Sequence, residues 1–159
     1  MICLIYEDRE GYCRIVKAKQ SFQHEFEADD NAIARLHQVA LKDVTEFLAC
    51  DESKIPTDKT FRDAWKKGDQ NEPIKIDFEK ALSIHRERLK EASETKIQHY
   101  RKELELCSNN IPKRIAIEKT IELLLKMHKG NLTHCKTVQD IKIAIPKELK
   151  NVWTFYALR

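Results

Sequence analysis

The sequence predicts an α+β fold: a small N-terminal antiparallel hairpin or sheet with one helix, followed by a long helical hairpin and a short C-terminal helix. Two β-prone runs, separated by a polar turn, occupy the first eighteen residues. Apolar residues then recur at helical spacing after residue 77. We therefore expect two domains: residues 1–76 form a small α+β module that ends in a Trp-containing connector, and residues 77–159 form the helical part.

Composition indicates a folded chain. The 159 residues correspond to about one domain, and the 42% apolar share excludes wholesale disorder. Three Gly and four Pro exclude a collagen-like or linker-dominated chain. No apolar run approaches the ~18 residues of a membrane span, and the first residues lack a signal-peptide pattern. Five cysteines at irregular spacing are typical of reduced thiols, which favours a cytoplasmic protein.

The first fifty residues predict a three-stranded sheet with one helix. Ile2–Tyr6 and Tyr12–Ala18 form the expected hairpin, in which Gly11 supplies a positive φ at the end of the turn. Apolar residues at helical spacing over residues 33–44 predict a helix, which the two preceding Asp residues can cap. Thr45–Cys50 is β-prone and is expected to add a third strand.

The connector holds an aromatic pair. Phe61 and Trp65 stand four residues apart, which predicts that they share one side of a helical turn. Residues 66–73 are expected to form a polar loop, and Ile74–Ile76 a short extended segment.

The helical part begins with an unusually long helix. Asp77 is a good N-cap, and the helical pattern continues to about Leu106. Its apolar stripe is narrow, so it must pair with another helix to be stable. We expect that partner over Lys113–Lys129, with Gly130 just after its C-terminus, to complete a helical hairpin.

The C-terminal segment predicts a short helix and an aromatic tail. Thr137 and Asp140 have the spacing of a capping box, and a further helical turn is expected over Lys147–Trp153. Aromatic residues gather at Trp153, Phe155 and Tyr156. This tail either folds back on its own domain or inserts into a partner.

Three segments, in this order, resemble an uncharacterised family of proteins carried by prophages and phages of α-proteobacteria. They are TFRDAW at 60–65, IDFEKA…IHRERL at 76–89 and PKELKNVW at 146–153. The resemblance covers roughly residues 50–153 and implies a phage-derived context among virion-assembly or accessory genes. It implies no catalytic residue. The chain departs from the family pattern at Asp63, where Asn is common, and in the extension 154–159.

Two sets of residues are candidates for partner binding. In the first, Phe61 and Trp65 are an aromatic anchor and Arg62 adds a directional charge, since Trp and Arg are frequent interface hot spots. The alternative is that both rings pack at the junction of sheet and helices. The second set lies on the helices and consists of His85, Arg86, Arg88 and Trp153.

His85 lies on or beside the apolar stripe of the long helix, which also favours a structural role. No Ser, Cys or carboxylate stands at a spacing that would activate it, and no HExxH motif is present. We therefore predict no catalytic residue. Cys107, His128, His134 and Cys135 lack paired short spacings, and no Gly-rich phosphate loop occurs. The sequence thus predicts neither a metal site nor a cofactor.

Charge divides the chain. Residues 1–76 carry a net charge of −3, whereas residues 77–129 and 130–159 each carry +3. The basic residues of the long hairpin alternate with glutamates, which favours ion pairs on a solvated face over the tracking of phosphates. Nucleic-acid binding through the basic back half therefore stays an alternative.

These observations together predict a non-enzymatic protein–protein interaction protein, or an assembly or accessory protein of prophage origin. The long charged hairpin and the Phe61/Trp65 region would contact a phage or host protein, or another copy of the chain. The alternatives are a nucleic-acid-binding accessory protein and a small inhibitor or antitoxin-like partner protein. No membrane partner is expected.

Overall fold

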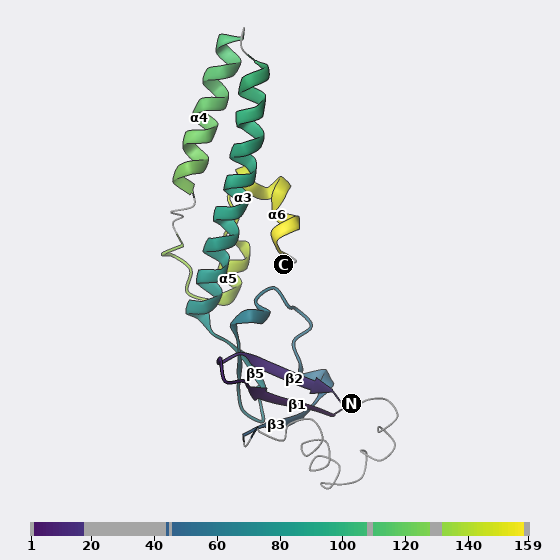
Figure 1. The fold of residues 1–159 in the computed structure, drawn as a ribbon. Coiled ribbons are helices and arrows are strands. Elements are labelled where there is room, and N and C mark those ends of the chain that lie inside the picture. Colours follow the sequence, from purple (N-terminus) through teal and green to yellow (C-terminus); the bar gives the residue numbers. More distant parts are fainter. Residues whose placement is uncertain (1, 18–43, 45, 108–109, 128–131, 158–159) are drawn as a thin grey trace. The chain divides into compact units, whose positions relative to one another are not determined.

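The computed structural model describes residues 2–17, 44, 46–107, 110–127 and 132–157. The chain divides into two compact units, Met1–Asp77 and Phe78–Arg159, with the boundary one residue after the predicted position. A small antiparallel sheet comes first, then a long helix pair and a short C-terminal helix, so the predicted α+β class is confirmed (Figure 1). The helix expected over residues 33–44 falls, except for Val44, outside the described residues.

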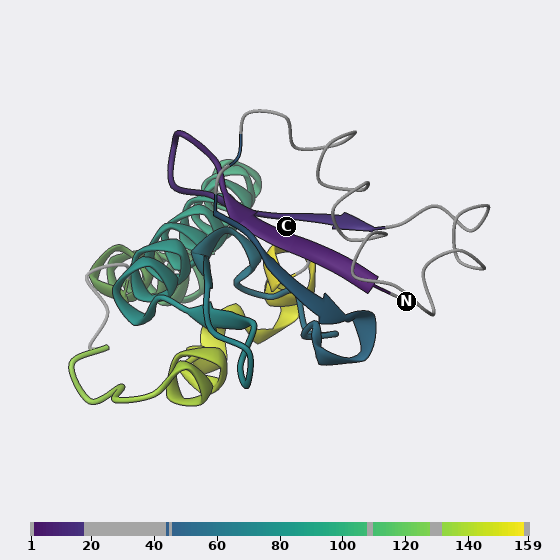
Figure 2. The ribbon, with the colours of Figure 1, turned by 90° about the horizontal axis from the view of Figure 1, so that it is seen from below.

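The first unit contains a three-stranded antiparallel sheet. β1 (Ile2–Glu7) lies between β2 (Cys13–Lys17) and β3 (Leu48–Asp51) (Figure 2). The turn between β1 and β2 has Gly11 at φ +78°, as expected, since this backbone conformation disfavours other residues. The third strand begins at Leu48, not at Thr45, and continues to Asp51, so its predicted bounds were too early.

A second, two-stranded sheet corrects the prediction for the connector. The short 3₁₀ helix η3 (Arg62–Ala64) leads directly into β4 (Trp65–Lys67), which pairs with β5 (Ile74–Ile76). Phe61 and Trp65 therefore do not share a helical turn. The extended conformation of Trp65 is stabilised by its pairing with Ile76, a partner that local spacing does not reveal.

The core of the first unit combines residues from both sheets. It contains Cys3, Ile5, Cys50, Trp65 and Ile74, all of which are buried. Strand pairing brings Cys3 opposite Cys50, and both remain free thiols. Trp65 thus serves packing in this unit.

The second unit is built on one long helix. α3 (Phe78–Leu106) packs against α4 (Ile111–Met127), α5 (Val138–Ile143), the 3₁₀ turn η4 (Lys147–Leu149) and α6 (Lys150–Ala157). Figure 1 shows α4 along one side of α3 and α6 along the other. The predicted helical hairpin is therefore present.

Two predicted helices differ from the structure: α4 begins earlier, and the turn expected over Lys147–Trp153 begins as the 3₁₀ turn η4 and continues as α6 from Lys150 to Ala157. The capping box at α5 is confirmed, because Thr137 and Asp140 bond reciprocally to each other's backbone N–H. α4 begins two residues before the predicted Lys113. The reason is that the Asn110 side chain accepts a bond from the N–H of Lys113 at 3.1 Å and so caps the helix earlier. Pro112 fits in this first turn because no intrahelical bond is needed there. The predicted C-terminal residue Gly130 lies outside the described residues.

Gly68 closes the loop between β4 and β5 and gives a first prediction. A Cβ at this position would lie 1.9 Å from the carbonyl oxygen of Glu72. We expect Gly68→Ala to lower the free energy of unfolding by about 1–3 kcal/mol, because the backbone must shift. Chemical denaturation would measure this. Gln70→Ala, an exposed change in the same loop, is the control, and an equal effect of both variants would contradict the prediction.

Ser93 gives a second prediction. Its side chain is 1% exposed, and its hydroxyl has no hydrogen-bond partner in the described part of the chain. A buried hydroxyl without a partner is costly, and Ala also favours a helix more than Ser. We expect Ser93→Ala to stabilise the protein by about 1 kcal/mol, and by more than Ser83→Ala on the exposed side of the same helix. Thermal unfolding measures both, and a destabilised Ser93→Ala variant would show that the hydroxyl has a partner.

Candidate partner-binding surface

The structure separates the seven predicted partner-binding residues by exposure. Four are buried: Phe61 (1% exposed), Trp65 (3%), His85 (1%) and Trp153 (9%). Arg62 and Arg86 are exposed, and Arg88 is half-buried. The aromatic anchor is therefore not presented to a partner, because both of its rings lie in the interior. Only the arginines of the predicted set lie at the surface.

His85 has a structural role within the second unit. Its Nε2 lies 3.2 Å from the carbonyl oxygen of Ala144, so the ring N–H donates a hydrogen bond to that oxygen. The ring also meets Trp153 edge-on, with centroids 5.0 Å apart. Burial lowers the pKa of His85, and the charge of Arg88 lowers it further, against the raising effect of the Ala144 bond. A neutral imidazole thus links α3 to the residue that follows α5.

The thiols of β1 and β2 are poor nucleophiles. All five cysteines are free, and burial raises the pKa of Cys3 and of Cys13 to about 11. A thiol with such a pKa is protonated near neutral pH and reacts slowly. The described residues also contain no group of three or more His, Cys, Asp or Glu side chains that could hold a metal ion. No described helix combines the length and the apolar character that crossing a bilayer requires.

Many basic side chains of the helical hairpin are paired. Lys113 bonds Glu103 at 2.8 Å across the two helices, and Lys126 bonds Glu122 at 2.6 Å along α4. Arg114 approaches Glu118 more loosely, at 3.8 Å. The interleaved charges therefore form pairs along and between the helices. A phosphate backbone would have to compete with carboxylates for these cations.

The hairpin also exposes large apolar side chains. They belong to the end of α3 and to α4: Leu106 (85% exposed), Ile111 (68%), Ile115 (47%), Leu123 (45%) and Leu125 (45%). α4 buries Ile117 and Leu124. Leu125 is 45% exposed although its neighbour Leu124 is buried, because only one side of α4 faces α3. We call these five exposed side chains the apolar hairpin surface.

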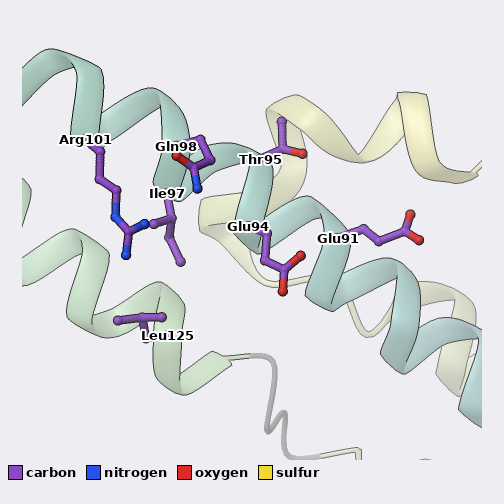
Figure 3. Close-up of a pocket in the computed structure, with 7 residues that line it drawn as sticks. All are labelled: Glu91, Glu94, Thr95, Ile97, Gln98, Arg101 and Leu125. Carbon is purple, nitrogen blue, oxygen red and sulfur yellow. The ribbon is translucent and has the colours of Figure 1, made fainter.

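A groove of about 620 Å³ lies on the same hairpin. Its lining consists of Glu91, Glu94, Thr95, Ile97, Gln98 and Arg101 from α3 and Leu125 from α4. Figure 3 shows Arg101, Ile97 and Leu125 where α3 faces α4, with Glu94 and Glu91 further along α3. Sequence reasoning missed this groove, because its residues look like any charged helix surface until the path of α4 is known.

Comparison with known proteins gives no relative. No protein-family model matches the chain, and neither curated proteins nor solved structures include a similar one. The resemblance to prophage-borne proteins therefore stays a prediction.

The buried ring of His85 predicts a pH dependence. The pKa of His85 is lowered in the folded protein. As the pH falls, the imidazole is therefore protonated in the unfolded chain before it is protonated in the folded chain. Stability is full above the ordinary His pKa of 6.5 and falls as pH drops below it. The free energy of unfolding falls by at most about 1.4 kcal/mol for each pH unit by which the pKa of His85 is lowered. Urea unfolding between about pH 7.5 and pH 5 measures this slope.

Two variants test whether His85 causes this dependence of the unfolding free energy on pH. His85→Gln has lower stability at neutral pH, since the ring contact with Trp153 is lost, but its stability should change less over the same pH range. His99→Gln is the control, because His99 is exposed and its variant should keep the wild-type slope. An unchanged slope in His85→Gln would show that another group causes the pH dependence.

Proposed function

We propose that this chain is a non-enzymatic protein-interaction or assembly protein of prophage origin, and that its α3–α4 hairpin binds a phage or host protein. The observation that carries the proposal is the apolar hairpin surface. Large apolar patches on a protein surface commonly mark interaction sites. The prophage context rests on the sequence resemblance alone.

The strongest part of this surface is at the tip of the hairpin. Leu106, at the end of α3, and Ile111, at the start of α4, are the two most exposed of its side chains. Ile115 follows Ile111 after one helical turn, so these two isoleucines share a face of α4. Adjacent exposed apolar side chains flanked by charges match the core-and-rim composition of protein interfaces. The tip therefore fits a protein partner that brings its own apolar residues.

The charge pattern favours a protein over a nucleic acid as partner. Lys113 and Lys126 are each in an ion pair with a glutamate of the hairpin. Nucleic-acid interfaces are more strongly basic than this mixed surface. A small inhibitor or antitoxin-like role would use the same hairpin and differs only in the partner, which would be a single protein in a fixed ratio.

Affinity capture with a variant in the tip tests the proposal. Tagged full-length protein would be recovered from its host, and the bound proteins identified by mass spectrometry. We expect virion or assembly proteins to bind the wild type and to be lost with the double variant Ile111→Glu/Ile115→Glu, because buried charges at the interface are costly.

The matched control is Ile143→Glu, since Ile143 is 70% exposed on α5 and lies outside the hairpin. It should keep the bound proteins, and circular dichroism should show that all variants are folded. Equal recovery with wild type and double variant would contradict the hairpin as the binding surface. One stoichiometric host protein would support the inhibitor alternative, and nuclease-sensitive recovery would support nucleic-acid binding.

A further inference from the structure

We propose that the groove on α3 binds the same groove of a second copy of this chain, with the two α3 helices antiparallel across a two-fold axis at position 96. The inference rests on the proposed function and specifies one partner for the hairpin. It uses a different part of the hairpin from the exposed isoleucines at the tip.

The groove holds opposite charges that have no ion-pair partner in the described part of the chain. Glu91 and Glu94 lie toward one end and Arg101 toward the other (Figure 3). Within the described ranges none of these three side chains is in an ion pair, unlike Lys113 and Glu103 on the same hairpin. Charges held on one rigid helix without an internal partner are available to a molecule that enters the groove.

The polar residues that line the groove are arranged symmetrically along α3. Four exposed lining residues of α3 fall into two pairs centred on position 96, Glu91 with Arg101 and Glu94 with Gln98. In an antiparallel pair of helices with this centre, Glu91 of each copy faces Arg101 of the other. Glu94 likewise faces Gln98, whose amide can donate to the carboxylate. Each favourable contact occurs twice, as a two-fold interface requires.

The charges of the groove fit a second copy of the chain better than a nucleic acid. A nucleic acid is disfavoured here, because Glu91 and Glu94 would repel its phosphates. A second copy instead brings an arginine to the acidic end and a carboxylate to the basic end. Leu125, which is 45% exposed, adds apolar area beside these pairs, next to the buried Ile97.

The size of the contact predicts its strength. Glu91 and Arg101 are about 15 Å apart along the helix axis, so the shared surface is smaller than a standard interface of about 800 Å² per partner. We therefore expect a reversible dimer with a dissociation constant in the micromolar range. Its charge pairs should make it weaker at high salt.

Charge reversal tests the inference. Sedimentation equilibrium of the full chain, from about 1 to 500 µM, gives the dissociation constant. We expect Arg101→Glu or Glu91→Arg alone to weaken the dimer by about 100-fold, since each creates two like-charge contacts. The double variant Glu91→Arg/Arg101→Glu should recover most of the wild-type affinity, because the pairs are restored with exchanged signs.

The control is Lys119→Glu, which makes the same change in net charge as Arg101→Glu at an exposed position of α4 outside the groove and should leave the dissociation constant within about threefold. A wild type that stays monomeric at the highest concentration would overturn the inference, and so would a dimer that neither single reversal weakens. Affinity capture distinguishes a failure of the dimer from a failure of the proposed function. Groove variants that still bind a protein through Ile111 and Ile115 would leave the proposed function standing while the dimer fails.

Discussion

The second unit depends on the side of α3 that its neighbours bury. The helix has 29 residues, so it is about 44 Å long, and an isolated helix with so few apolar positions would be marginal in water. Its buried residues are Ala81, Leu82, His85, Leu89, Ala92, Ser93 and Ile97. Three of them, Ala81, Ala92 and Ser93, have small side chains, which lets neighbouring elements approach closely. α4, α5, η4 and α6 supply the burial that keeps α3 folded.

The same constraint produces the surface to which we assign function. α4 buries Ile117 and Leu124 and leaves Ile111, Ile115, Leu123 and Leu125 between 45% and 68% exposed. One side of α3 is not covered by its neighbours, so charged residues such as Glu91 and Arg101 border an open groove. The exposed isoleucines and the groove are thus two consequences of one long, sparsely covered helix. One surface suits an apolar partner, and the other is complementary to itself.

The sequence was sufficient where signals are local. The bounds of α3 follow from Asp77 and the apolar stripe, and the capping box at Thr137 was readable from two residues. The sequence was insufficient to predict contacts between segments that are far apart in the chain. Trp65 is extended because it pairs with Ile76, and His85 is fixed by a carbonyl 59 residues away. The burial of the predicted aromatic anchor and the position of the groove both depend on such long-range packing, which one sequence does not display.

The self-complementary groove that we propose on α3 is lined by residues of the helical unit alone. The most direct measurement is a dilution series of amide NMR spectra of the full chain, in which each backbone position reports its own environment. If the groove forms the dimer, the amide chemical shifts of residues 91–101 and of Leu125 change with concentration. The chemical shifts of β1–β5 do not change. Spectra that do not change with concentration, or shifts confined to the residues of the first unit, would contradict this dimer.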